Sequence, residues 1–396
     1  MRSMQAFTYQ VPTRVIFGRE TEQQAGPAVQ AEGGSTVLVL YGGGSAVRSG
    51  LLGRVTASLT GCGLRWYTKG GIQPNPVLRF VCETLEEYRD KEIDFILGVG
   101  GGSVLDTAKA LAAGLPRPEV PVWDYYSGKE KPITAIPVGA VLTIAAAGSE
   151  TSDSTVLTNE ATQEKRGFNA EWNRPRFAIL NPELTYTLPP YQTACGVADI
   201  LMHTLDRYFS DVQGNELTDA LAEAILRTTV RFGKTALVRP DDYEARSELM
   251  WCGSLSHNNL TGLGRTKDFT VHQLGHELSG RYGMAHGASL AIMWPAWARQ
   301  VWTRDPARFA RLGRTVFGVS EEDDGQAALA AIAAVEACFR DLGLPVSLGQ
   351  SEAGVIPEEE LEALALGCSR GRSRSVGSFC PLDHDGLLAV YRAANH

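Results

Sequence analysis

The chain lacks the features that mark secreted, membrane and nucleic-acid-binding proteins. Its seven cysteines are widely spaced and form no Cys-x-x-Cys pair, which indicates reduced thiols rather than a disulfide framework. No apolar run approaches the roughly 18–20 residues that span a bilayer, and the first residues lack the apolar core of a signal peptide. Lys and Arg total 37 against 45 Asp and Glu, without the basic face that phosphate binding requires. We therefore expect a cytoplasmic protein that binds neither membranes nor nucleic acid.

The length and the strand-like runs predict a nucleotide-binding fold in the first half. At roughly 100–200 residues per domain, 396 residues predict about two domains. The runs Thr36–Tyr41 and Asp94–Val99 are typical of buried parallel strands, and each is closed by Gly-Gly-Gly-Ser and followed by helical spacing. Further strands are predicted at 133–138 and 176–180. This alternation favours a doubly wound α/β dinucleotide-binding domain.

Helical periodicity replaces the strand pattern beyond Pro189-Pro190. Because prolines remove backbone donors and stop regular structure, we place the domain boundary at this point. Residues 1–188 then form the α/β domain, and residues 189–396 form an all-α domain. Its helices are predicted over 193–208, 216–235, 243–260, 269–282 and 285–301.

Histidine is scarce in the chain, yet three of its seven histidines fall between positions 272 and 286. His272 and His276 share one helical face, as do Asp199 and His203 one element earlier. His286 stands at the start of the next predicted helix. A single histidine is most often structural, but one carboxylate and three imidazoles make a four-ligand site for a divalent metal.

The spacing of His272 and His276 also matches the H-E-x-x-H pattern of zinc hydrolases. Gln273 stands where those enzymes carry a glutamate as general base. A metallohydrolase is therefore an alternative that this residue disfavours.

Two glycine turns are candidates for binding the phosphates of a nucleotide. Gly100–Ser103 lies between a strand and a helix, where it can be a tight turn or an anion cradle. The second turn contains Gly42, Gly43 and Ser45 and follows Leu40-Tyr41 without an Asp or Glu, while Arg48 follows within one helical turn. A carboxylate at this point would repel the 2′-phosphate of NADP, so its absence predicts NADP(H) rather than NAD.

Taken together, these motifs resemble the iron-containing (group III) alcohol dehydrogenases over nearly the whole chain. The resemblance is carried by Gly100-Gly-Gly-Ser103 with Asp106 and Lys109, Gly148-Ser149-Glu150, Asp199-x-x-x-His203, His272-x-x-x-His276 and Ala285-His286-Gly287. Within the family the chain looks most like NADPH-dependent aldehyde reductases and butanol dehydrogenases. They share Tyr41-Gly-Gly-Gly-Ser45, Gly70-Gly71-Ile72-x-Pro74-Asn75-Pro76 and Thr187-Leu188-Pro189-Pro190.

The resemblance implies a role for each matching position. Asp199, His203, His272 and His286 would bind Fe²⁺ or Zn²⁺. His276 would lie near the nicotinamide without binding the metal, and Asp106 at the adjacent ribose, both in the catalytic set. Gly101, Gly102 and Ser103 would hold the pyrophosphate, and Thr143 and Lys165 match further cofactor contacts.

We expect reversible hydride transfer between NADP(H) and a short-chain aldehyde/alcohol pair in the cleft between the domains, by a homodimer. Two departures from the family pattern are Ala147, where a hydroxyl is expected, and the basic Arg265-Thr266-Lys267. These two cations would bind an anionic aldehyde if they face the cleft, but the more common arrangement for such side chains is exposure to solvent. The alternatives are an NAD-dependent glycerol-dehydrogenase type, a metal-independent maleylacetate-reductase type and a non-catalytic nucleotide sensor.

Overall fold

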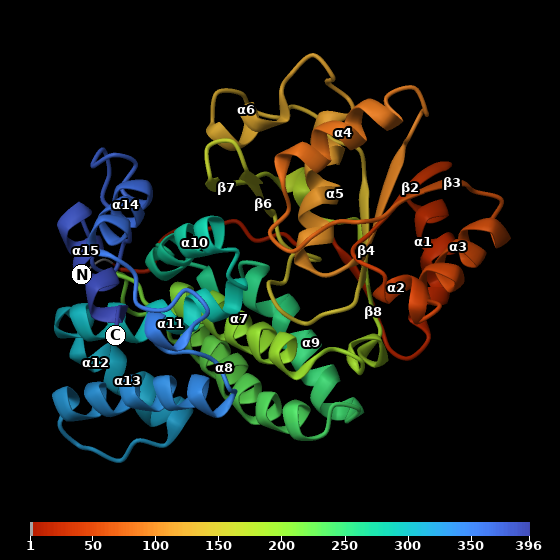
Figure 1. Ribbon diagram of the computed structural model, residues 1–396. Coiled ribbons are helices and arrows are strands. Elements are labelled where there is room, and N and C mark those ends of the chain that lie inside the picture. Colours follow the sequence, from red (N-terminus) through yellow and green to blue (C-terminus); the bar gives the residue numbers. More distant parts are fainter. Residues whose placement is uncertain (1–2) are drawn as a thin grey trace. The chain divides into compact units, whose positions relative to one another are not determined.

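The structure, a computed structural model, describes residues 3–396, which form two units (Figure 1). One unit is Gln10–Leu188, and the other joins Pro189–His396 to residues 3–9. Gln5 shows why the first residues pack with the second unit. Its backbone N–H donates to Gly264 O over 2.8 Å, and its side-chain amide donates to the Thr266 hydroxyl over 3.1 Å. The α/β unit therefore starts later than residue 1, where the sequence prediction began it.

Six parallel strands form the sheet of the α/β unit, in the order β1-β8-β5-β4-β2-β3. A separate antiparallel hairpin, β6-β7, follows the fifth strand. The strands are β1 (Arg14–Phe17), β2 (Thr36–Tyr41), β3 (Arg65–Lys69), β4 (Phe95–Gly100), β5 (Val138–Leu142), β6 (Ser154–Asn159), β7 (Glu164–Asn169) and β8 (Phe177–Leu180). The helices are α1 (Ala25–Ala31), α2 (Ser45–Arg48), α3 (Leu51–Gly61), α4 (Leu78–Tyr88), α5 (Gly102–Gly114) and α6 (Val122–Ser127).

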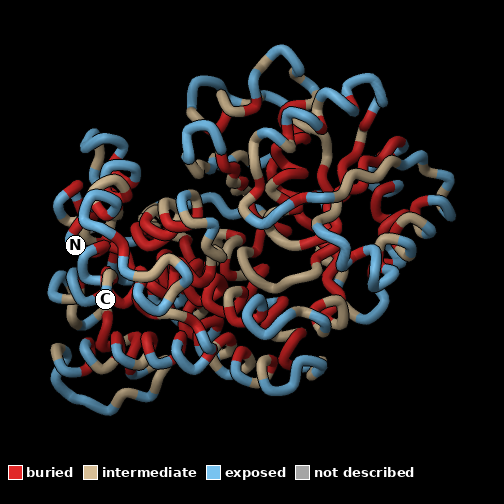
Figure 2. Tube along the Cα trace, viewed as in Figure 1, coloured by how far each residue is buried: buried red, intermediate tan, exposed pale blue. Residues whose placement is uncertain are grey.

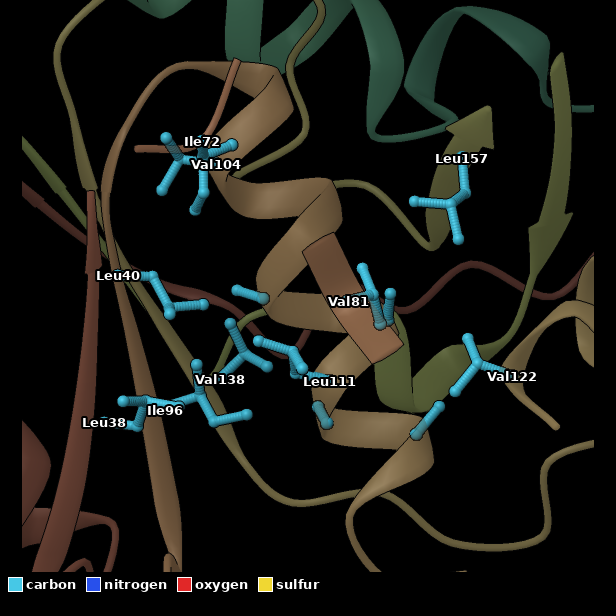
Figure 3. Close-up of a cluster of buried hydrophobic side chains, with 14 of the residues drawn as sticks. Leu38, Leu40, Ile72, Val81, Ile96, Val104, Leu111, Val122, Val138 and Leu157 are labelled. Carbon is cyan, nitrogen blue, oxygen red and sulfur yellow. The ribbon is translucent and has the colours of Figure 1, made fainter. Parts of the chain in front are cut away.

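Alternate residues of the central strands point to opposite faces of the sheet and build two cores. Val37 and Val39 of β2 join the core under α1 and α3, whereas Leu38 and Leu40 join the core under α4, α5 and α6. Figure 3 shows the second core, in which Leu111 of α5 packs near the strand residues. Helices on both faces of a parallel sheet confirm the doubly wound α/β fold.

The strand predicted at 133–138 is wrong. Residues 131–137 form no regular structure, and the strand begins only at Val138. Pro132 and Pro137 lack the N–H that a central strand donates, and Ile133 is 68% exposed. The apolar run therefore lies before the strand, exposed at Ile133 and packed partly against the core at Ala135 and Ile136.

The second unit is helical throughout, which confirms the predicted all-α domain. Its helices are α7 (Pro190–Tyr208), α8 (Glu216–Val238), α9 (Tyr243–His257), α10 (Thr270–Tyr282), α11 (His286–Val301), α12 (Pro306–Leu312), α13 (Asp324–Asp341), α14 (Glu358–Cys368) and α15 (His384–Ala394). Figure 2 shows long buried stretches within this unit, and α7 and α11 are buried over most of their length. Among residues 3–396, no helix has the length and apolar character needed to cross a bilayer.

Candidate active site

Two glycines let the helices that carry the histidines approach one another closely. A side chain at Gly287, in the first turn of α11, would collide with the backbone of Cys195 on α7. At Gly275, a side-chain carbon would stand 2.8 Å from Ser289 Oγ, so α10 also lies directly against α11. Cys195 is one turn before Asp199, and Gly275 lies between His272 and His276. These contacts set the spacing of α7, α10 and α11 where the candidate ligands project.

Three of the four predicted ligands converge. Asp199, His272 and His286 each offer a ligand atom, and these atoms lie within 4.8 Å of one another. His203 lies outside that group, but its Nε2 is 3.7 Å from Asp199 Oδ1, the same oxygen that lies 3.7 Å from His286 Nε2. The His203 ring also stacks on that of His272, with centroids 4.3 Å apart.

These separations fit ligands around a metal ion better than they fit hydrogen bonds. A distance of 3.7 Å between Asp199 Oδ1 and each imidazole nitrogen is too long for a hydrogen bond. Two ligands at about 2.1 Å from a tetrahedral metal stand about 3.4 Å apart. Burial, and then His257, lower the pKa of His203 well below its ordinary value, which keeps the ring neutral. Neutral imidazoles and a carboxylate are the donor set that suits Fe²⁺ or Zn²⁺.

Two residues that sequence reasoning missed adjoin this cluster. Asp206, also on α7, places Oδ2 2.6 Å from His272 Nδ1; burial raises the pKa of this carboxyl, whereas the hydrogen bond with His272 and the charge of Arg207 lower it. Its position seven residues after Asp199, on the same helical face, was a usable signal. His257 packs edge-on against His203 with centroids 3.9 Å apart. It lies on α9, and nothing in its local sequence marks that contact.

His276 and Gln273, both on α10, have different surroundings. The His276 ring centroid is 5.3 Å from that of His286, although His276 does not belong to the converging group. The Gln273 side-chain carbonyl accepts a 2.8 Å hydrogen bond from Arg374. An amide held by a guanidinium cannot act as the general base that a metallohydrolase requires.

In the α/β unit, the predicted cofactor residues gather at one edge of the sheet. β2, β4 and β5 are parallel neighbours, so their carboxyl ends meet at the same edge. Gly42–Ser45 follows β2, Gly101–Ser103 follows β4, and Thr143 follows β5. The Thr143 N–H donates to Gly100 O over 3.1 Å, which joins two of these turns. The N-terminus of α5 opens at this edge, where its first N–H groups can bind phosphate.

The turn after β2 combines open space with a cation. A side-chain carbon at Gly43 would have no atom within 4 Å, whereas at Gly44 it would collide with the Arg48 guanidinium. Arg48, the last residue of α2, therefore folds back over the turn. The turn therefore has an exposed cation beside it.

A buried lysine organises the loop beside Asp106. Lys109 is 1% exposed, and its ammonium donates to Ser149 O, Ser152 O, Ser154 O and the Ser149 hydroxyl, at 2.7–3.2 Å. Burial lowers its pKa to about 8. The Ser149 hydroxyl in turn donates to Asp106 over 2.9 Å. Ser149, in the Gly148-Ser149-Glu150 motif, thus positions the Asp106 carboxylate.

The remaining cofactor positions lie nearby. Lys165 on β7 donates to Asn75 Oδ1 over 2.8 Å. Burial raises the pKa of the Asp106 carboxyl, and the charge of Lys165 is one of the influences that oppose this rise. Ala147 lies beside the start of α5, with its Cβ 3.7 Å from where a side chain at Gly102 would begin. A methyl group therefore occupies the place where the family pattern has a hydroxyl.

The structure gives the two cations that suggested an anionic substrate partners within the protein. The Arg265 side chain is 1% exposed and forms a 2.7 Å ion pair with Asp219. Lys267 donates to Asn259 Oδ1. The cations that favoured a charged aldehyde are engaged inside the helical unit, because a buried guanidinium needs a carboxylate partner.

Comparison with known proteins gives the same family over both halves of the chain. The family model "Iron-containing alcohol dehydrogenase" matches residues 12–182, and "Fe-containing alcohol dehydrogenase family, C-terminal" matches residues 193–395. NADH-dependent butanol dehydrogenase A of Clostridium acetobutylicum is 37% identical over 391 residues, 98% of this chain and 99% of that protein.

Two further relatives extend the comparison. NADPH-dependent aldehyde reductase YqhD of Escherichia coli is 37% identical over 347 residues, 87% of this chain and 89% of that protein. The crystal structure of NADH-dependent butanol dehydrogenase A from Thermotoga maritima superposes with a TM-score of 0.95, at 34% identity and full coverage of both chains. The chain belongs to the iron-containing alcohol dehydrogenase family and is an alcohol/aldehyde oxidoreductase that uses a metal and a nicotinamide cofactor.

Proposed function

We propose that the chain reduces short-chain aldehydes to primary alcohols with NADPH, and oxidises the alcohols in reverse. The observation that carries the proposal is the convergence of Asp199, His272 and His286, with His203 against the same carboxylate oxygen. These four residues would hold Fe²⁺ or Zn²⁺. A metal ion bound there supplies Lewis-acid polarisation of the carbonyl oxygen.

The reaction balances as a hydride transfer followed by a protonation. NADPH bound at the sheet edge would supply the hydride for the carbonyl carbon and would leave as NADP⁺, and the oxygen would take one proton to give the alcohol. His276 lies beside the metal cluster without belonging to it, so we assign it to delivering that proton from water.

The cofactor residues are assigned on the same edge-of-sheet geometry. Gly101, Gly102 and Ser103 would bind the pyrophosphate through the N-terminus of α5, with Thr143 joined to the same turn. Asp106 would bind the nicotinamide-side ribose, and Lys165 lies near that carboxylate. Gly42, Gly43 and Ser45 would surround the 2′-phosphate.

Preference for NADP(H) over NAD(H) rests on the turn after β2. No carboxylate follows Leu40-Tyr41, Gly43 leaves open space, and Arg48 covers Gly44. Both cofactors occur among the relatives, since the butanol dehydrogenases are named NADH-dependent and the aldehyde reductase NADPH-dependent. We expect a preference of at least about tenfold in kcat/KM, which needs about 1.4 kcal/mol.

We further propose a homodimer. β1 is an edge strand, and Phe17 at its end is 41% exposed. In the helical unit, Met4 and Phe7 are each 51% exposed, and exposed apolar side chains of this kind suit contact with a second copy. Light scattering after gel filtration measures the mass, and a monomer would contradict this assignment.

One experiment tests the enzymatic assignment. Neutral aldehydes of increasing length are offered with NADPH and, in parallel, with NADH, while bound iron and zinc are measured on the same sample. We expect metal near one equivalent per chain and faster turnover with NADPH. Turnover by metal-free protein would contradict the ligand assignment. Binding of NADPH without turnover of any aldehyde would indicate a nucleotide sensor.

A further inference from the structure

Asp206 contacts one of the proposed metal ligands from the side away from the cluster. It lies on α7, its side chain is 1% exposed, and its Oδ2 is 2.6 Å from His272 Nδ1. At this distance the imidazole N–H donates to the carboxylate. His272 can then offer only Nε2 to a metal, which is the tautomer that binding on that side requires.

The same residue also fixes the start of the helix that carries His272. The Asp206 carbonyl accepts a 2.8 Å hydrogen bond from the Asp268 N–H, just before α10 begins at Thr270. Asp206 therefore positions both the backbone that leads into α10 and the ring of His272.

The burial of Asp206 destabilises the fold, which suggests that this residue has a functional role. Its second oxygen, Oδ1, is buried and has no hydrogen-bond partner among residues 3–396. A buried carboxylate with an unsatisfied oxygen lowers the free energy of unfolding. A buried carboxylate can orient a metal-binding histidine and increase its basicity. Such a role explains why Asp206 is buried beside His272.

We propose that Asp206 is a positioning residue for metal binding, acting through His272 and not as a ligand itself. The inference rests on the proposed metal site. Loss of the carboxylate should weaken metal binding about 10–100-fold while leaving the cofactor turns of the α/β unit untouched.

The test measures metal affinity directly, on full-length protein stripped of metal. Dissociation constants for Zn²⁺ are determined by chelator competition for the unmodified protein, Asp206→Asn and Asp206→Ala. The amide of Asp206→Asn can still accept from His272 Nδ1 but has no charge, so we expect a loss of about tenfold, and about 100-fold for Asp206→Ala. Visible spectra of the Co²⁺-loaded proteins report the ligand geometry, which we expect to change in both variants.

Glu223→Gln is the matched control. Glu223 is buried on the neighbouring helix α8 and bonds Tyr208 and Arg311, away from the proposed ligands. It should destabilise the fold without changing Zn²⁺ affinity or the Co²⁺ spectrum. NADPH binding and the unfolding midpoint of the stripped proteins show whether each variant is folded, and Asp206→Asn carries the test if Asp206→Ala does not fold.

Two outcomes would overturn the inference, and they differ. If the unmodified protein binds Zn²⁺ tightly and both Asp206 variants match it in affinity and spectrum, Asp206 has only a structural role. If the unmodified protein binds neither Zn²⁺ nor Fe²⁺, the metal site fails and the inference fails with it.

Discussion

The Arg48 guanidinium lies over Gly44, in the space that a side chain at position 44 would fill. The cation is exposed and lies beside the glycine turn after β2. This contact places a charge beside a turn that has no carboxylate, so the proposed preference for NADPH can be tested at this turn.

Gly43→Asp should erode or reverse the preference for NADPH. The backbone at Gly43 does not adopt the left-handed conformation, and a side chain there meets no atom within 4 Å, so the substitution fits. The new carboxylate would repel a 2′-phosphate and accept from ribose hydroxyls. The measurement is kcat/KM for both cofactors side by side at low salt. Gly43→Asn is the neutral control of the same size, and equal behaviour of the two variants would contradict a charge effect.

His272→Ala should abolish metal binding and aldehyde reduction together. The imidazole is one of the three groups whose ligand atoms lie within 4.8 Å of one another. Because the cofactor residues lie in the other unit, NADPH binding should persist. Metal content and NADPH fluorescence titration check both expectations. A variant that kept metal and turnover would show that the ligand assignment is wrong.

His276→Ala should retain metal but react more slowly. Loss of a proton-transfer group costs about 10²–10⁴-fold in rate, and the ring is not part of the converging cluster. Metal analysis and kcat on the same preparation separate the two effects. If metal is lost instead, His276 is a ligand.

The candidate ligands were predictable from local spacing, whereas contacts between distant segments were not. Periodicity located α7, α10 and α11, and the spacing of Asp199 and His203 placed both on one helical face. The Arg265 ion pair was not predictable, because Asp219 lies on a separate helix and local spacing carries no information on that contact. The prediction of a strand at 133–138 was wrong because it relied on apolar composition alone. Pro132 and Pro137 lack the N–H that a central strand must donate.

Lys109→Met should destabilise the α/β unit. The ammonium is the donor to three carbonyl groups of the 149–154 segment, and its loss leaves buried acceptors unsatisfied. We expect a decrease of about 3 kcal/mol in the free energy of unfolding, measured by urea titration. Lys129→Met, at an exposed surface position, should change stability little. Equal stability of the two variants would show that the Lys109 bonds contribute nothing net.

Arg265→Ala should lower stability without changing substrate selection. Removing the guanidinium takes one partner from the buried Asp219, which keeps its ion pair with Arg308, and the loss of one charge-assisted hydrogen bond costs about 1.5–3 kcal/mol. Thermal unfolding and kcat/KM on neutral and anionic aldehydes of equal length provide the two readouts. A selective loss on the anionic aldehyde at unchanged stability would restore a substrate-binding role for this residue.

The tie between Gln5 and Gly264 makes the α/β unit an insertion within the helical unit rather than a domain in front of it. The backbone passes from one unit to the other twice, after Tyr9 and again after Leu188. Any rotation of one unit about the other must twist two polypeptide connections at once, which restricts it more than a single linker would. A helical fragment cut at residue 189 would also lose its own N-terminal segment. A circular permutant that joins the C-terminus to residue 3 and opens the chain within the α/β unit would keep that segment attached.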